Sequence, residues 1–288
     1  MIQIRIDNDA NYKSIFFNGK TIRQKINGNI PITSPKFAEI EDVAINSKCF
    51  ANCNYCYVSA LSSGENFDNI VEKSIDVWGS VSQNSRPFQI AIGGAGEPTL
   101  HPQFIDFIKS VKDLGITPNY TTNGMHLSSD ILESTEKYCG GVALSYNPHI
   151  KKVFDIAIKK LKSIKTKLNI HIILGTDQSL IDVKNLYEIH KDDIEYFVIL
   201  PYQASGRGKE IETSLVWNNF FNFIYSLPEK YQSKFAFGAL FYKWINENDI
   251  KLDIDIYEPE IYSGYRIMDD SYKTLRISSY NTNPKNNI

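Results

Sequence analysis

Three cysteines lie within one segment of eight residues, at Cys49, Cys53 and Cys56. Thiolates are soft donors that suit iron–sulfur clusters, and the Cys-x-x-x-Cys-x-x-Cys spacing lets one loop surround a single cluster. A 4Fe-4S cluster held entirely by protein takes four cysteines. A loop with three cysteines and no fourth nearby therefore predicts a cluster with one iron open to a small ligand.

Two other interpretations of these thiols stay open. A structural zinc ion is one, with a fourth ligand such as His101 or Cys139, although zinc ligands more often come as two separated pairs. A disulfide is the other, and it is disfavoured because residues 1–7 do not read as a signal peptide. We therefore expect a reducing, cytoplasmic compartment that keeps the thiols available for metal.

The cysteine loop, with Tyr55 directly before its third cysteine, resembles the signature loop of the radical S-adenosylmethionine (SAM) superfamily. The resemblance implies a 4Fe-4S cluster whose open iron binds the amino and carboxylate groups of SAM. It further implies that an electron from the cluster, delivered by a donor such as flavodoxin or ferredoxin, splits SAM into methionine and a 5'-deoxyadenosyl radical.

The elements that must position this loop follow a repeating βα pattern, which predicts a parallel sheet. Apolar runs, the expected strands, cover residues 43–45, 88–92, 116–121, 142–145, 170–174 and 196–200. Helices are expected near residues 68–83, 102–114, 128–138, 150–164, 180–190 and 214–226. We predict an α/β fold, a partial (β/α)6 barrel of TIM type, whose chemistry lies at the carboxyl ends of the strands.

Three parts of the chain are predicted. Residues 1–40 form an N-terminal β-hairpin extension, because apolar residues alternate with polar ones around an Asn18-Gly19 turn. Residues 41–230 form the barrel. Residues 231–288 form a small C-terminal β extension that covers the barrel mouth, with a hairpin over residues 267–277.

The ends of the expected strands carry motifs that the resemblance interprets. Ala95, Gly96 and Glu97 resemble the Gly-Gly-Glu-Pro motif and would seat the methionine part of SAM, with Ala95 in place of the first glycine of the pair. The nucleoside would be held by Ser145, with Thr122 and Asn147 as further candidates. Leu200 and Tyr202 would flank the adenine. Turn formation, helix capping and core packing are alternative roles for these residues.

Composition limits the remaining choices. The net charge of −2 gives no overall attraction to nucleic acid, and no apolar run is long enough to span a bilayer. Because no cysteine follows Cys139, we expect a single cluster and no auxiliary one. Whether Arg207 or Arg266 contacts substrate stays open.

The function expected from these features is that of a radical SAM enzyme, an oxidoreductase that abstracts hydrogen from a peptide or small-molecule substrate. The strand-end motifs resemble the maturase-like branch of the superfamily. Two alternatives stay open, an activating enzyme for a glycyl-radical partner protein and a non-catalytic protein with a structural metal.

Overall fold

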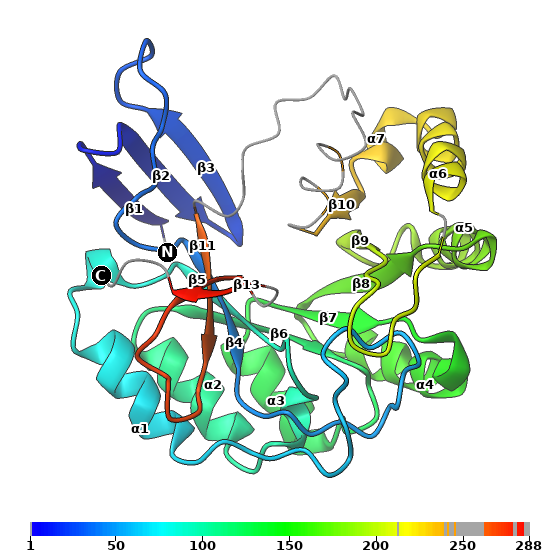
Figure 1. Ribbon diagram of the computed structural model, residues 1–288, viewed down its shortest axis with the longest axis horizontal. Coiled ribbons are helices and arrows are strands. Elements are labelled where there is room, and N and C mark those ends of the chain that lie inside the picture. Colours follow the sequence, from blue (N-terminus) through cyan, green and yellow to red (C-terminus); the bar gives the residue numbers. More distant parts are fainter. Residues whose placement is uncertain are drawn as a thin grey trace.

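The computed structural model describes residues 2–211, 213–238, 241, 245, 262–278 and 281–284. The strands of these residues form two sheets (Figure 1). One is a small antiparallel sheet of three strands near the amino terminus. The other has ten strands in the order β10-β9-β8-β7-β6-β5-β4-β11-β12-β13. This second sheet curls into a half-barrel, so the predicted α/β partial barrel is confirmed.

All six predicted barrel strands are present in parallel pairing. They are β4 (Ile40–Ala44), β5 (Gln89–Ile92), β6 (Thr117–Thr122), β7 (Gly141–Ser145), β8 (Lys167–Leu174) and β9 (Tyr196–Pro201). Two strands that were not predicted extend the parallel sheet at its edges. β10 (Phe235–Phe237) pairs with β9, and β11 (Ser263–Ile267) pairs with β4. The described part of the sheet therefore has eight parallel strands.

Helices cover the outer side of this sheet (Figure 1). They are α1 (Ile70–Ser74, continued by a π-helical turn over Ile75–Gly79), α2 (Phe104–Asp113), α3 (Ser129–Tyr138), α4 (Lys151–Lys162), α5 (Asp177–His190), α6 (Ser214–Ser226) and α7 (Glu229–Gln232). The period-two alternation of each strand turns its apolar residues toward the helices. In β8, for example, Ile170, Ile172 and Leu174 are buried in the core shared with Phe154 of α4.

The amino-terminal sheet has three strands, one more than the predicted hairpin, because a third strand follows the Asn18-Gly19 turn. Its strands are β1 (Ile2–Asp7), β2 (Tyr12–Phe17) and β3 (Lys20–Lys25). The sheet lies at the amino ends of the barrel strands. Lys167 Nζ, at the start of β8, donates a hydrogen bond to Asn18 O (2.6 Å), and the Phe16 ring stacks on Phe88 just before β5.

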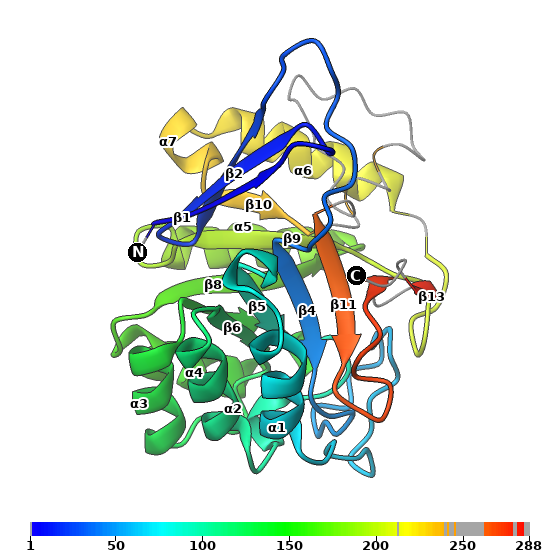
Figure 2. The ribbon, with the colours of Figure 1, turned by 90° about the vertical axis from the view of Figure 1, so that its left-hand side faces the viewer.

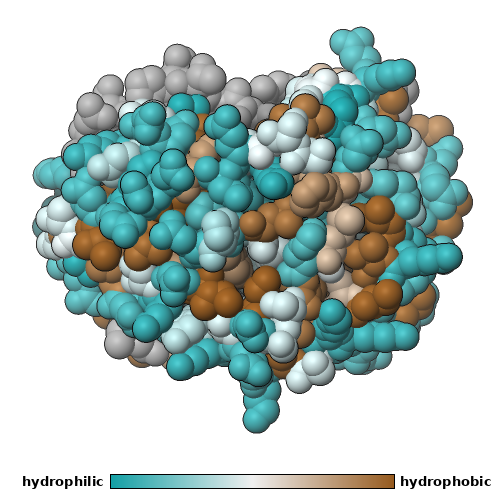
Figure 3. Space-filling model, turned by 90° about the horizontal axis from the view of Figure 1, so that it is seen from below, coloured by the Kyte–Doolittle hydropathy of each residue, from teal (hydrophilic) through white to brown (hydrophobic). Residues whose placement is uncertain are grey.

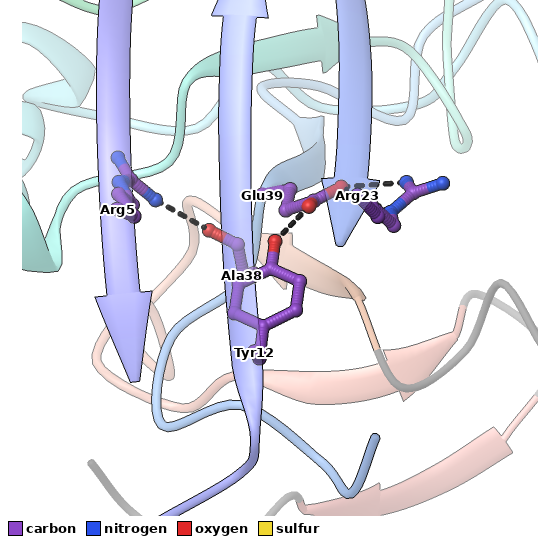
Figure 4. Close-up of polar contacts among 5 residues, drawn as sticks. All are labelled: Arg5, Tyr12, Arg23, Ala38 and Glu39. Atoms are coloured by element: carbon purple, nitrogen blue, oxygen red, sulfur yellow. Dashed lines mark hydrogen bonds and ion pairs between the residues drawn. The ribbon is translucent and has the colours of Figure 1, made fainter. Parts of the chain in front are cut away.

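A buried carboxylate joins this small sheet to β4 (Figure 4). Glu39, directly before β4, accepts hydrogen bonds from the hydroxyl of Tyr12 and from Arg23 Nε (2.9 Å). Arg5 donates to Ala38 O (3.2 Å). Burial raises the pKa of Glu39 to about 8. The small sheet is therefore joined to the start of β4 by a largely buried polar contact.

The carboxyl-terminal part adds a β-hairpin to the same sheet. β11 pairs antiparallel with β12 (Arg276–Ser278), and β12 pairs with β13 (Asn281–Pro284). The hairpin predicted over residues 267–277 is wrong in its bounds, because residues 268–275 form the loop that joins β11 to β12. Figure 2 shows β11 running beside β4 toward the same end of the molecule. Much of residues 231–288 lies outside the described residues, so coverage of the mouth stays a prediction, as do the domain boundaries.

No helix in the described ranges has the length and apolar character needed to cross a membrane.

The ion pair between β4 and β11 gives a test of how the barrel edge is held. Arg266 Nε lies 2.8 Å from Glu41 Oε2, with only 7% and 5% of the two side chains exposed. Arg266→Ala is expected to lower the free energy of unfolding by about 3–5 kcal/mol, because a buried carboxylate loses its partner. Lys151→Ala breaks an exposed pair with Asp155 and is expected to cost less than about 1 kcal/mol. Urea unfolding measures both, and equal losses would contradict the expectation.

Candidate active site

The three cysteines lie in the loop that joins β4 to α1, residues 45–69, named here the cluster loop. The loop folds back on itself, because Lys48 forms a β-bridge with Leu61 and Cys49 N donates to Leu61 O (2.9 Å). Figure 3 views the end of the molecule where this loop lies, and apolar residues gather across that face. The cluster loop contributes exposed apolar side chains, namely Phe50, Val58 and Leu61.

The three thiols are free, half-buried and close enough to influence one another. Burial raises the pKa of Cys49, and it raises that of Cys53 to about 11. In the described ranges no three His, Cys, Asp or Glu side chains converge on one point as a single metal ion requires. A cluster needs no such convergence, because each thiolate binds a different iron. Three thiolates on one loop match the cysteine ligands of a 4Fe-4S cluster. Cys139 ends α3 and packs against the core.

Gly96 lets the loop after β5 touch the backbone of the cluster loop. A Cβ on Gly96 would lie 2.5 Å from Asn46 Oδ1 and 2.7 Å from Lys48 N, so no larger residue fits without movement. Glu97 N donates to Lys48 O (2.8 Å), and Asn46 Nδ2 donates to Glu97 O (2.8 Å). Ala95, half-buried, precedes this contact. The segment thus holds the residue directly before Cys49.

The carboxylate of Glu97 is 3% exposed and turns toward protein donors. Its Oε1 accepts from Thr99 Oγ1 (2.7 Å) and Thr122 Oγ1 (2.8 Å), and its Oε2 accepts from Asn123 N (2.7 Å). Burial raises the pKa of Glu97, and these hydrogen bonds oppose the rise. Asn123 Nδ2 in turn lies 3.6 Å from the sulfur of Cys49. The residue directly after β6 therefore reaches the first cysteine, while its backbone is held by one buried acid.

A second connection runs from the end of β7 to the second cysteine. The amide oxygen of Asn147 accepts a hydrogen bond from the hydroxyl of Tyr55 (2.9 Å) and lies 3.5 Å from Cys53 Sγ. The amide nitrogen of Asn147 donates to Ser145 O (3.4 Å). Burial raises the pKa of Tyr55. Tyr55 and Asn147 thus meet directly beside the sulfur.

Arg207, whose role the sequence left open, contacts the cluster loop. Its Nε donates to Cys53 O (2.8 Å) and its Nη1 donates to Ala60 O (2.9 Å), while its backbone N–H donates to Cys56 O (2.9 Å). Gly206 approaches so closely that a Cβ would lie 2.4 Å from the carbonyl oxygens of Cys56 and Tyr57. The loop after β9 therefore fixes the backbone around two cysteines.

A small pocket of about 130 Å³ opens beside the cluster loop at the ends of β8 and β9. Tyr202, whose hydroxyl donates to Lys209 O (2.7 Å), lines it together with Tyr55. Other lining residues are Tyr146, Ile173, Gly175 and Asp182.

The structure thus gathers most of the residues that the sequence singles out around one loop. Leu200 is the exception, because it approaches Gly238, which follows β10, and no contact with the cluster loop is found for it in the described ranges. Sequence reasoning missed Asn46, as well as His149, whose Nε2 lies 2.8 Å from Ala51 O. It noted the polar segment 121–124 at the end of the third expected strand but gave Asn123 no role of its own.

No protein-family model matches the chain. It is 29% identical over 106 residues to a Pyrococcus furiosus protein named a tungsten-containing aldehyde ferredoxin oxidoreductase cofactor-modifying protein, covering 35% of this chain and 28% of that protein. It is 27% identical over 194 residues to a Methanocaldococcus jannaschii protein provisionally named a glycyl-radical enzyme activating enzyme, covering 63% of this chain and 73% of that protein.

Among solved structures, SuiB of Streptococcus suis bound to its precursor peptide SuiA has a similar fold. The TM-score is 0.65 at 16% identity, covering 87% of this chain and 62% of SuiB. The chain thus spans less than two thirds of the length of SuiB and of the Pyrococcus protein. SuiB has also been solved with S-adenosylmethionine bound. The predicted resemblance to the radical SAM superfamily is therefore confirmed at the level of the fold.

Two substitutions of glycine by alanine test the contact between the β5 loop and the cluster loop. Gly96→Ala is expected to lower the iron bound after anaerobic reconstitution about fivefold or more, because overpacking against backbone costs about 1–3 kcal/mol. Gly28→Ala is the control, since a Cβ there meets nothing within 4 Å. Iron content per protein is the measurement. Full iron content in Gly96→Ala would show that the contact does not shape the site.

A second prediction concerns Arg207. Arg207→Ala removes two side-chain hydrogen bonds to cluster-loop carbonyls, and bonds from charged donors contribute about 1.5–3 kcal/mol each. Amide hydrogen exchange over residues 53–61 should accelerate about tenfold or more. The control is Arg86→Ala, because Arg86 also donates to backbone carbonyls, those of Leu114 and Val81, away from this loop. Equal exchange in the wild type and Arg207→Ala would contradict the prediction.

Proposed function

We propose that this chain, whose fold and cysteine loop resemble those of the radical SAM superfamily, is a single-cluster radical SAM enzyme. The observation that carries the proposal is the arrangement of Cys49, Cys53 and Cys56 at the carboxyl ends of a half-barrel sheet, without a fourth cysteine in the loop. Three thiolates leave one iron of a 4Fe-4S cluster free to bind SAM. When bound, this pair supplies the electron transfer that splits SAM into methionine and a 5'-deoxyadenosyl radical.

In this proposal the protein residues bind and orient the cluster and SAM. Cys49, Cys53 and Cys56 hold the cluster. Because the carboxylate of Glu97 is occupied by protein donors, its part in seating the methionine is to shape the backbone of residues 95–97. Exposed backbone groups at such a strand end suit the amino and carboxylate groups of SAM.

The nucleoside part of SAM is proposed to enter the pocket beside the cluster loop. Tyr55 and Tyr202 line this pocket with aromatic surface that suits an adenine ring. Ser145 is half-buried, and no hydrogen bond of its hydroxyl is found in the described ranges, so the hydroxyl is available to a ribose. Thr122 is less suitable, since its hydroxyl already donates to Glu97. Leu200 stays a candidate for apolar contact only.

The substrate is proposed to be a peptide or a small molecule, with flavodoxin or ferredoxin as electron donor. Support for a peptide comes from SuiB, which was solved with a precursor peptide bound. The relative from Methanocaldococcus supports a second candidate, activation of a glycyl-radical partner protein. If hydrogen abstraction occurs only when a folded partner enzyme is present, the second candidate is favoured over the first.

Formation of 5'-deoxyadenosine tests the proposed function. The protein is reconstituted anaerobically with iron and sulfide, reduced with dithionite and incubated with SAM. The wild type is expected to form 5'-deoxyadenosine, and Cys53→Ala is expected to fall to background because one iron loses its ligand. Cys139→Ala is the matched control and should retain activity, since Cys139 packs against the core.

The opposite outcome is also defined. If the purified wild type holds zinc in place of iron and forms no 5'-deoxyadenosine after reconstitution, the proposal is wrong. The three cysteines would then belong to a non-catalytic structural metal site.

A further inference from the structure

Asp42 lies in the middle of β4 and points away from the helices. Its two neighbours fix this direction, because successive residues of a strand face opposite sides. Val43 is fully buried in the core that the sheet shares with the helices. Glu41 pairs with Arg266, whose guanidinium lies 6.0 Å from the centre of the Trp78 ring in that core. Asp42 therefore projects from the concave face of the half-barrel.

Solvent reaches Asp42 even though strands flank it on both sides. It pairs in register with Ala91 of β5 and with Tyr265 of β11, yet its side chain is exposed. The surrounding protein nevertheless raises the pKa of this carboxyl to about 6. Exposure together with close surroundings places the carboxylate in a recess of the concave face. A group with this pKa is mainly ionised at neutral pH.

This carboxylate has no partner within the described part of the chain. No hydrogen bond or ion pair of Asp42 is found there, in contrast to its neighbour Glu41. Arg276 of β12 acts on the neighbouring Tyr265, but its Nη2 donates to Ser271 Oγ (3.5 Å), and no ion pair between Arg276 and Asp42 is found in the described ranges. A charge held in partly desolvated surroundings without a partner is unfavourable, so such a group is expected to have a ligand.

The recess lies below the proposed site of radical formation. A strand rises about 3.3 Å per residue, so Asp42 lies about 7 Å along β4 from Ala44, the residue at its carboxyl end. The β1-β2-β3 sheet packs at the amino end of the barrel strands. His171 of β8 faces the same concave side, because Ile170 and Ile172 pack toward the helices. A substrate placed here lies between the cluster loop and the β1-β2-β3 sheet.

We propose that Asp42 binds a cationic group, an amine or a guanidinium, of the substrate on the concave face. This inference rests on the proposed function, because it takes the concave face as the substrate site. Ion pairs between ammonium or guanidinium and carboxylate groups are strong when both are partly desolvated. The pair would orient the substrate by a charged group while a nearby carbon meets the adenosyl radical.

The probe that tests the proposal is n-butylammonium, with n-butanol as its uncharged counterpart. Binding of each to the reconstituted full chain in the presence of SAM is measured by saturation-transfer NMR. The wild type should prefer the ammonium about tenfold, which equals about 1.4 kcal/mol. Asp42→Asn should abolish this preference, whereas Asp113→Asn, an exposed acid at the end of α2, should preserve it.

Two further arms keep the test decisive. Asp42→Glu retains the charge and should retain the preference, which covers the case that Asp42→Asn does not fold. A lysine blocked at both ends should also bind, and binding tighter than that of n-butylammonium would indicate a peptide as the source of the amine. Equal binding of n-butylammonium and n-butanol to the wild type, or an unchanged preference in Asp42→Asn, would overturn the proposal.

Formation of 5'-deoxyadenosine by the wild type without added amine tests the proposed function separately. Absence of this product with an intact, Asp42-dependent ammonium preference would overturn the proposed function and leave the cation site. Formation of 5'-deoxyadenosine without an Asp42-dependent ammonium preference would overturn the cation site and leave the proposed function.

Discussion

A carboxylate that is buried away from water needs hydrogen-bond donors from the protein. At Glu97 these donors come from separate loops, which the carboxylate therefore holds together. Its two oxygens accept from the end of β6 and from the turn after β5, while its backbone N–H and carbonyl bond to the cluster loop. Asn123, held by this carboxylate, reaches the sulfur of Cys49. The position of the first cysteine thus depends on a buried charge that is itself satisfied within the protein.

The positions of Cys53 and Cys56 depend on contacts from loops that follow strands further along the sheet, β7 and β9. Asn147 at the end of β7 lies beside Cys53, and Arg207 after β9 binds carbonyls around Cys53 and Cys56. The cluster loop has little regular structure of its own, so its shape comes from these partners. Each is supplied by a loop at the carboxyl end of a parallel strand, which is the end where such barrels converge.

The barrel was predictable from the sequence to the extent that its signals are local. Six buried strands alternating with amphipathic helices leave a pattern in the chain, and thiol spacing within one loop is visible directly. β10 and β11 leave no such pattern, because short strands are defined by their partners β9 and β4. Likewise, Gly206 and Gly208 indicate a turn around Arg207, but nothing local tells which carbonyls the arginine will bind. The sequence likewise did not reveal that the Glu97 carboxylate points toward protein donors.

The contacts of Arg207 have a consequence for the order of maturation. The side chain that holds the Cys53 backbone comes from 154 positions later in the chain. During synthesis, the cysteines emerge well before β9 and its following loop exist, so the cluster loop lacks the Arg207 contacts at that stage. Metal insertion should therefore follow completion of the sheet, and a newly made chain would present flexible thiols to any metal it meets. Delivery of iron and sulfide to an already folded apoprotein is the assembly route that this architecture favours.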